Sequence, residues 1–340
     1  MEGVSVIIPT HNREHTLKVV IDSYFSQSCV REIIFVLDGC TDGTLKFLKS
    51  IQGKGKKADE KMNTYNGVDP DKCISQKEVT RREKWKTRDH CKILDEYESS
   101  ANSINIKILE NPKRKGLPFS RNRGVKASVF PYVFMGEDDV ILGKDCIKEM
   151  IGIMRTEEAD ITGGRVFYMS DNESYKDTFV RYRQKEKDLS GLDEFGIRLN
   201  YPPAKFTEVP YLQAVALMKK EIFTEVSYDT HYRGSSYREE TDFYLKCRKA
   251  GRKILLLNDQ ICYNLSPKYC KGSGQRGINP AIYEFSAITN NLRFLIKHYS
   301  FLRSEYNIEK SVISLQYDFI KRRFNERIKK SIISLLKFKK

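Results

Sequence analysis

The sequence predicts an α/β fold: a Rossmann-like, mostly parallel central sheet flanked by helices. Short apolar runs that indicate buried strands alternate with segments whose apolar residues recur at helical spacing. Acidic residues and glycines follow directly after several of these runs, and the carboxyl ends of the strands are where an open α/β sheet binds its ligands. With 340 residues, the chain is long enough for one large domain or two ordinary ones.

The alternation of strands and helices begins near the N-terminus. Residues 4–9 predict a buried strand that a proline ends, and residues 16–25 carry apolar side chains at helical spacing. Residues 32–37 predict a second strand. A segment rich in turn formers, Asp38–Thr44, then leads into a short helix over 44–51. Two strand–helix units in succession favour parallel pairing of their strands.

Residues 53–103 interrupt this alternation. Chain breakers such as Asn66-Gly67 and a mostly charged stretch over 75–98 predict an inserted, partly helical segment. Such a segment is interpreted either as a lid over a functional site or as a mobile surface insertion.

The alternation resumes at residue 105 and completes a domain over residues 1–280. Further strands are predicted over 105–109, 132–135, 160–168, 209–219 and 253–257. Further helices are predicted over 119–129, 146–154 and 239–250. Residues 170–207 indicate irregular, polar structure.

Three carboxylates follow the apolar run Tyr132–Met135. Glu137, Asp138 and Asp139 repel one another and are costly to bury without a partner. At the carboxyl end of a buried strand, such a cluster indicates either a hard cation or a solvated acidic turn. A site made of oxygen ligands suits Mg²⁺ or Mn²⁺, which keep water ligands and share substrate phosphates.

The composition limits the classes of partner and location. The net charge of +15 favours anionic partners such as nucleotides or lipid head groups. No recognised nucleic-acid-binding motif accompanies it, so we expect no nucleic-acid partner. The eight cysteines form no Cys-x-x-Cys pair, which argues against a zinc site and a disulfide framework and fits a cytoplasmic protein. The first strand begins at Val4, which leaves no room for a signal peptide, and no apolar run approaches the roughly 18 residues of a membrane span.

Five short motifs, in this order, resemble those of the family 2 inverting glycosyltransferases with the GT-A fold. They are Val4–Glu14, Val36–Thr44, Ser120–Gly124, Glu137–Asp139 and Arg238–Lys246. Each motif is weak alone, but five in register make the resemblance specific. It implies a metal-dependent enzyme that moves a sugar from a nucleotide sugar, most readily a UDP-sugar, to a hydroxyl of a glycan or lipid-linked acceptor.

The resemblance also implies a donor site. Asp38 matches the residue that accepts from a uracil N–H, and His11 replaces a tyrosine but can still stack on a pyrimidine. Arg121 matches an arginine that faces the base. An ordinary loop histidine and a surface helix arginine remain the alternatives at these two positions. The other donor-binding candidates are Pro9, Thr10, Asn12, Arg13 and Asp138.

The acids after the fourth strand match the family's metal site, with Asp139 as the metal ligand and Asp138 beside it on the ribose side. A bound Mn²⁺ or Mg²⁺ would offset the charge of the departing nucleoside diphosphate.

Glu240 matches the family's general base, which takes the proton of the acceptor hydroxyl. It is a glutamate where the family has aspartate, so the preceding Glu239 is a second candidate. A favourable pair of acids at a helix N-terminus is the structural alternative. We expect Asp242 to hold the start of this helix by capping or by accepting from nearby amides.

Three positions depart from the family's motifs. Gly136 replaces the first aspartate of its D-x-D-D sequence, Asn264 stands where many relatives have a histidine, and Gln213–Val215 replaces a G-x-N stretch. Gly136 and Asn264 favour an alternative function, a catalytically inactive GT-A protein that binds nucleotide or acts as a scaffold. The intact acids at positions 38, 139 and 240 argue against it.

Residues 281–340 predict a basic helical C-terminal extension. One stripe of apolar residues at helical spacing is flanked by Lys and Arg: Ile313, Ile320, Phe324, Ile328, Ile332 and Leu335. Such a helix lies on an anionic membrane, packs on the catalytic domain or packs on a second subunit. The first option would place the protein at the cytoplasmic face of a membrane, and all three remain open from the sequence.

Overall fold

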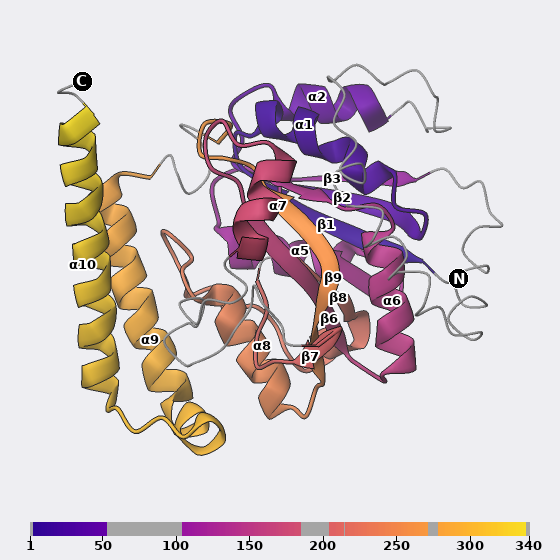
Figure 1. The fold of residues 1–340 in the computed structure, drawn as a ribbon. Helices are drawn as coiled ribbons and strands as arrows, with labels where there is room; N and C mark the ends of the chain where they lie inside the picture. Colours follow the sequence, from indigo (N-terminus) through magenta and orange to yellow (C-terminus); the bar gives the residue numbers. More distant parts are fainter. Residues whose placement is uncertain (1–2, 53–103, 185–203, 214, 271–277, 338–340) are drawn as a thin grey trace.

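The computed structural model describes residues 3–52, 104–184, 204–213, 215–270 and 278–337 (Figure 1). The predicted insertion over 53–103 lies outside these residues. The strands are β1 Val4–Thr10, β2 Val30–Asp38, β3 Asn105–Asn111, β4 Tyr132–Met135, β5 Val140–Leu142, β6 Ile161–Tyr168, β7 Phe206–Glu208, β8 Ala216–Lys219 and β9 Ile254–Asn264. The helices are α1 Glu14–Phe25, α2 Thr44–Gln52, α5 Leu117–Ala127, α6 Cys146–Thr156, α7 Tyr175–Gln184, the 3₁₀ helix η4 Lys220–Thr224, α8 Glu239–Lys249, α9 Pro280–Tyr306 and α10 Val312–Lys337.

The described strands form one sheet in the order β3-β2-β1-β4-β8-β6-β9-β5, with β7 paired to β9. The first four strands of this order are parallel, as the strand–helix rhythm predicts. Strand β8 then runs antiparallel to both β4 and β6, so the sheet as a whole is mixed. The carboxyl ends of β1, β2 and β4 therefore meet at one edge, where a ligand site is expected.

Helices cover both faces of the sheet (Figure 1). Every residue of β1 is buried, because alternate side chains enter different hydrophobic clusters. Val6 and Ile8 pack in the cluster that includes α1 and α6, whereas Ile7 packs in the one that includes α8 and α9. This burial on both faces confirms the predicted α/β architecture.

Several segments differ from the sequence prediction, among them β5 and β7, which it did not include, and β9, which continues to Asn264 instead of ending at residue 257. The polar stretch after β6 contains helix α7, which is held by the stacking of Tyr182 on Phe167 with ring centroids 4.0 Å apart. The sequence does not indicate α7 because the segment is mostly polar: only Thr178 and Tyr182 of this helix are buried. The strand expected over 209–219 is limited to β8.

The C-terminal extension is helical, as predicted, and forms an antiparallel pair of helices, α9 and α10 (Figure 1). Helix α9 shares the α8 cluster through Phe294 and Leu302, and α10 joins it through Leu315. In the part of α10 whose side chains are described, the predicted apolar stripe does not pack on the catalytic domain. Its members Ile313 and Phe324 are exposed. The side chains of its other half, from residue 326 onward, lie outside the description. No helix among the described residues combines the length and apolarity of a membrane span.

Candidate active site

A cleft of about 1160 Å³ opens at the carboxyl ends of β1, β2 and β4. The start of α8 and the first turn of α9 complete its walls. Most residues predicted for the site line this cleft: Pro9, Thr10, His11, Arg13, Asp38, Asp138, Asp139, Glu239 and Glu240. Asn12 and Arg121 do not line it. The cleft thus brings together predicted residues from distant parts of the chain, from Pro9 on β1 to Glu240 on α8.

Asp38 ends β2 and is held by the loop that follows β3. Its Oδ1 accepts from the Lys115 N–H at 2.7 Å and from the Asn111 side-chain amide at 2.9 Å, and its Oδ2 accepts from the Gly116 N–H at 2.8 Å. The next residue, Gly39, has φ +69°, and a Cβ there would lie 2.7 Å from the nitrogen of Arg114. Glycine therefore permits the close approach that fixes the Asp38 carboxylate.

His11 and Asn12 follow β1 and have different surroundings. The Nδ1 atom of His11 lies 2.7 Å from the backbone oxygen of Asp38, which fixes the imidazole at the cleft wall. Asn12 has φ +54°, and its Oδ1 accepts from the Thr41 N–H at 2.7 Å. The side chain of Asn12 therefore joins the loops after β1 and β2 and does not reach the cleft as the donor-site prediction required.

The acidic pair after β4 carries more negative charge than its surroundings balance. Asp138 Oδ1 lies 3.8 Å from Arg13 Nε, and Asp139 Oδ1 accepts from the Asn264 side-chain amide at 2.9 Å. Burial raises the pKa of Asp138 to about 7; Arg13 acts against this rise, and the neighbouring Asp139 adds to it. A cation bound here would relieve the repulsion between the two carboxylates.

The donor atoms at this pair fit Mg²⁺ or Mn²⁺. The described residues contain no group of three or more His, Cys, Asp or Glu side chains placed to hold a metal ion. Such a group is not required, because these cations bind through one or two carboxylates together with substrate phosphates and water. Asp138 and Asp139 line the cleft and supply oxygen ligands only, as these hard cations prefer.

Gly136 has a packing reason for its departure from the family's aspartate. A Cβ at this position would lie 2.9 Å from the Tyr24 ring and 3.1 Å from Ile8. The Tyr24 hydroxyl donates to the backbone oxygen of Glu137 at 2.9 Å and accepts from its N–H at 3.1 Å. Tyr24 thus occupies the space of the absent side chain and fixes the start of the acidic segment.

Arg121 is fully buried and is bound by three carboxylates. Its guanidinium donates to Glu137, to Glu239 and, at 2.5 Å, to Glu240. The ring of Tyr228 lies 5.2 Å from the guanidinium carbon. The expectation that Arg121 faces the donor base is therefore corrected, as is the alternative of a surface residue. The side chain faces the glutamates because they are the nearest partners for a buried cation.

Glu239 and Glu240 both line the cleft, but they differ in exposure. The Glu239 side chain is 3% exposed and that of Glu240 is 26% exposed. Burial raises the pKa of Glu239 to about 8; Arg121 acts against this rise, and Glu240 adds to it. Glu240 is therefore the carboxylate of the pair that a molecule in the cleft can reach more readily.

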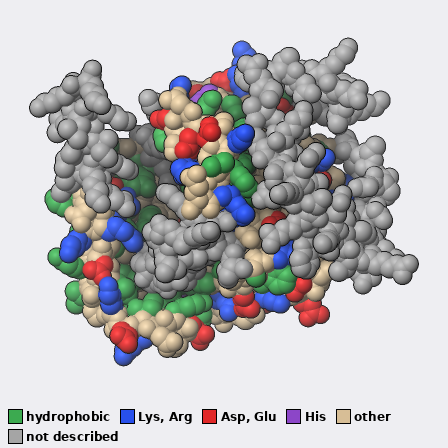
Figure 2. Space-filling view, in the orientation of Figure 1, with side chains coloured by type: hydrophobic (Ala, Val, Ile, Leu, Met, Phe, Trp, Pro, Cys, Tyr) green, Lys and Arg blue, Asp and Glu red, His purple; other side chains and the backbone are tan. Residues whose placement is uncertain are grey.

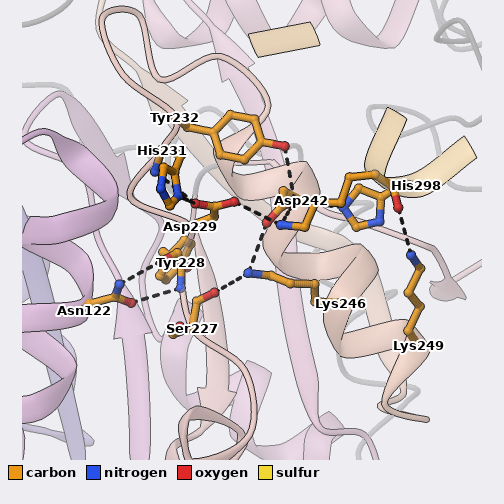
Figure 3. A network of polar contacts seen from close by, with 11 residues as sticks. Asn122, Ser227, Tyr228, Asp229, His231, Tyr232, Asp242, Lys246, Lys249 and His298 are labelled. Carbon is orange, nitrogen blue, oxygen red and sulfur yellow. Dashed lines mark hydrogen bonds and ion pairs between the residues drawn. The ribbon is translucent and has the colours of Figure 1, made fainter. Parts of the chain in front are cut away.

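Asp242 fixes the first turn of α8 to α9 (Figure 3). Its buried carboxylate accepts from His298 Nε2 at 2.8 Å and from the Tyr232 hydroxyl at 3.2 Å, and it forms an ion pair with Lys297 at 2.7 Å. Asp242 thus holds the start of α8, as expected, but its partners are side chains from α9 and from the loop before α8 instead of amides. His298 lies 56 positions along the chain, so no local pattern predicts this contact.

The cleft also includes residues that no motif indicated. Among them are Tyr168, Tyr211, Arg233, Ile282 and Tyr283. Ile282 and Tyr283 belong to α9, which the sequence assigned to the extension after residue 280. They reach the cleft only because α9 packs beside α8, a contact between segments about 40 residues apart that hydrophobic periodicity does not reveal.

The mixed sheet and the two acid pairs in the cleft are the arrangement that the five sequence motifs lead us to expect of a glycosyltransferase with the GT-A fold. The sequence pattern of the family described as Glycosyl transferase family 2 matches residues 5–68 and 87–215. This is more than half of the chain, which therefore belongs to that family.

One solved structure supports the fold, and a second shows only a weaker similarity. The structure of S. aureus TarS residues 1–349 in complex with UDP-GlcNAc has 14% sequence identity and a TM-score of 0.50, over 89% of this chain and 74% of that one. The mannosyltransferase PcManGT from Pyrobaculum calidifontis, in complex with GDP-Man and Mn²⁺, has 13% identity and a TM-score of 0.49, over 93% of this chain and 68% of that one. A comparison with curated protein sequences finds no match.

Proposed function

We propose that the enzyme is a metal-dependent inverting glycosyltransferase that uses a nucleotide sugar, specifically a UDP-sugar, and a glycan or lipid-linked acceptor. The observation that carries the proposal is the presence in one cleft of two acid pairs with different surroundings. Asp138 and Asp139 have a guanidinium nearby, that of Arg13, at 3.8 Å from Asp138, whereas Glu239 and Glu240 are both hydrogen-bonded to the fully buried Arg121. The six described cysteines are free thiols, which is consistent with a cytoplasmic location.

The nucleotide-sugar donor would bind to residues at the carboxyl ends of β1, β2 and β4. Asp38 Oδ2 accepts one hydrogen bond within the protein, so it retains capacity for a base N–H. His11 lies beside it at the cleft wall and offers a ring face for a pyrimidine. Asp139, with Asp138, would hold Mn²⁺ or Mg²⁺, which supplies positive charge toward the pyrophosphate when bound.

The acceptor half of the proposal depends on Glu240. Its carboxylate takes the proton of the acceptor hydroxyl as that oxygen bonds to the anomeric carbon. The bond from this carbon to the phosphate oxygen breaks at the same time, and the nucleoside diphosphate leaves with the electron pair. Attack from the side opposite the leaving group inverts the anomeric configuration. Arg121 holds the Glu240 side chain at 2.5 Å and thereby positions the base.

Donor hydrolysis and transfer test this proposal directly. The purified chain is incubated with UDP-sugars and GDP-sugars in Mn²⁺, in Mg²⁺ and in EDTA, with and without glycan or lipid acceptors. We expect release of UDP that depends on the metal, and NMR of the product should show an inverted anomeric centre. Full activity in EDTA would contradict the metal role, and a retained configuration would contradict the mechanism. Donor binding without turnover would support the inactive alternative.

A further inference from the structure

Helix α9 exposes a row of apolar side chains on the side away from the sheet. Phe285, Leu292 and Ile296 are 70%, 40% and 68% exposed. Their spacing of seven and four residues places them on one face of the helix. The opposite side of α9 is buried against the catalytic domain through Phe294 and Leu302. The exposed row is therefore not a part of the core.

Helix α10 exposes a second row with the same character. Its members are all at least 40% exposed and are spaced by four, three and four residues: Ile313, Tyr317, Ile320 and Phe324. The helix packs inward through Leu315 and Phe319, which are buried. An isolated apolar residue on a surface needs no explanation, but two rows of large side chains do.

The two rows lie side by side. The Asn291 side-chain amide donates to Gln316 at 2.8 Å, and Arg323 pairs with Glu284 at 2.5 Å, so the first part of α9 is in contact with the first half of α10. On each helix the row is on the side away from the inward-packing residues, so both rows contribute to one outer face. We call this face the hairpin face. In Figure 2, hydrophobic and basic side chains, with a few acidic ones among them, lie on the surface over α9 and α10, at the left of the view.

Basic side chains border the hairpin face. Arg293, Arg303 and Lys321 are exposed on α9 and α10. Of the acidic side chains described on and between the two helices, Glu284 pairs with Arg323, Asp318 pairs with Lys310, and Glu305 and Glu309 are near the turn. An apolar surface bordered by cations complements a lipid surface with anionic head groups, where tails and charges lie at adjacent depths.

The hairpin face also adjoins the cleft. Ile282 lies three residues before Phe285 on α9, is 60% exposed and lines the cleft together with its neighbour Tyr283. A surface that covers the hairpin face would therefore lie next to the cleft entrance formed by α9.

We propose that the hairpin face binds the surface of an anionic lipid bilayer and thereby presents the cleft to an acceptor carried by a lipid. The proposal deepens the acceptor half of the proposed function and depends on it for the identity of the acceptor. The rows on α9 and α10 enter the interface between head groups and tails, and the basic border contacts the head groups.

Vesicle binding by the full chain tests this inference. Sedimentation is measured with vesicles of phosphatidylcholine alone and with vesicles containing phosphatidylglycerol. The full chain should bind the second type, and Ile313→Glu combined with Phe324→Glu should abolish sedimentation. The matched control is Val129→Glu, which adds a negative charge at a 65% exposed valine in the loop before β4 and should bind as the native chain does. Lys321→Gln removes one charge and should weaken binding about fivefold, whereas Lys49→Gln on α2 should not.

The outcomes separate the inference from the proposed function. Loss of vesicle binding in the α10 variants, with UDP-donor binding unchanged, supports the hairpin face. Failure of the full chain to bind anionic vesicles overturns it, even if donor hydrolysis proceeds as proposed. A native dimer in light scattering that the same variants convert to a monomer also overturns it, because a second copy of the chain then covers the face. Vesicle binding by a chain that neither binds nor hydrolyses a donor would leave the surface supported and contradict the proposed function.

Discussion

The two acid pairs of the cleft differ in how their charge is balanced. Asp138 and Asp139 have Arg13 at 3.8 Å and a neutral amide, from Asn264, as neighbours. Glu239 and Glu240 are both bound by Arg121, which is fully buried. The protein cation of the first pair lies beyond hydrogen-bond distance, whereas the second pair is hydrogen-bonded to its protein cation.

This difference shows how similar side chains acquire different tasks in one cleft. A buried carboxylate that no cationic side chain holds by a hydrogen bond is suited to bind a metal ion, because the ion lowers the cost of its burial. A carboxylate held by a fixed guanidinium is suited to act as a positioned base, because its orientation does not depend on the ligand. The predictions below test whether the two pairs are separable in this way.

The largest expected effect is on catalysis by Glu240. Glu240→Gln keeps the shape of the side chain but removes the proton acceptor, so kcat should fall about 10²–10⁴-fold. Steady-state sugar transfer measures this loss, and Glu158→Gln, in the loop before β6, is the matched control with native activity. Native turnover by Glu240→Gln would show that the base is elsewhere.

Arg121→Met should cause the next largest effect, on folding. The substitution leaves three carboxylates around a neutral side chain, and breaking a buried ion pair costs about 3–5 kcal/mol. Urea denaturation measures the free energy of unfolding. Arg303→Met, at an exposed position on α9, should change it little. A small effect of Arg121→Met would mean that the glutamates do not depend on this arginine.

Asp242 should contribute stability that depends on pH. Burial acts against ionisation, but hydrogen bonds from His298 and Lys297 and the charge of Lys246 hold the pKa of Asp242 well below its ordinary value. A lowered pKa stabilises the folded protein fully above the unfolded value of about 3.9, and this stability is lost as the pH falls below it.

Asp242→Asn should therefore cost about 1.5–3 kcal/mol at pH 7, the value of a hydrogen bond to a charged group. Urea denaturation of both proteins at a series of pH values should show that the difference shrinks below about pH 4. A difference that is constant down to pH 3 would contradict the ionic role of Asp242.

The smallest of these effects is expected at Asn264, which orients Asp139. Loss of a hydrogen bond to a metal ligand typically lowers metal affinity about 10–100-fold. Asn264→Ala should therefore raise the Mn²⁺ concentration for half-maximal turnover by this factor and leave kcat at saturating metal nearly unchanged. Asn325→Ala on α10 is the control. An unchanged metal requirement would remove Asn264 from the proposed metal site.

The sequence predicts the position of the Asp138–Asp139 pair better than it predicts the surroundings of the Glu239–Glu240 pair. Asp138 and Asp139 follow a short buried strand, so strand pattern and charge together indicate their place at the sheet edge. The partnership of Arg121 on α5 with Glu239 on α8 joins residues 118 positions apart, which no local pattern specifies.

The sequence pattern of a helix likewise does not show which of its apolar side chains are buried. The apolar spacing of α10 predicts a helix correctly, but it does not indicate which apolar row is buried. Leu315 and Phe319 pack inward, whereas Ile313 and Phe324 are exposed. The choice depends on the shape of the surface that α9 and Tyr237 present, as the contact of Tyr237 with Phe319 at 5.3 Å between ring centroids shows.

Donor binding by two variants side by side tests the separation of the acid pairs most directly. Calorimetric titration of UDP-sugar in Mn²⁺ is carried out on the native chain, on Asp139→Asn and on Glu240→Gln. We expect Glu240→Gln to bind the donor with nearly native affinity and Asp139→Asn to lose the part of the affinity that depends on Mn²⁺. Native Mn²⁺-dependent binding by Asp139→Asn, together with loss of binding by Glu240→Gln, would contradict it.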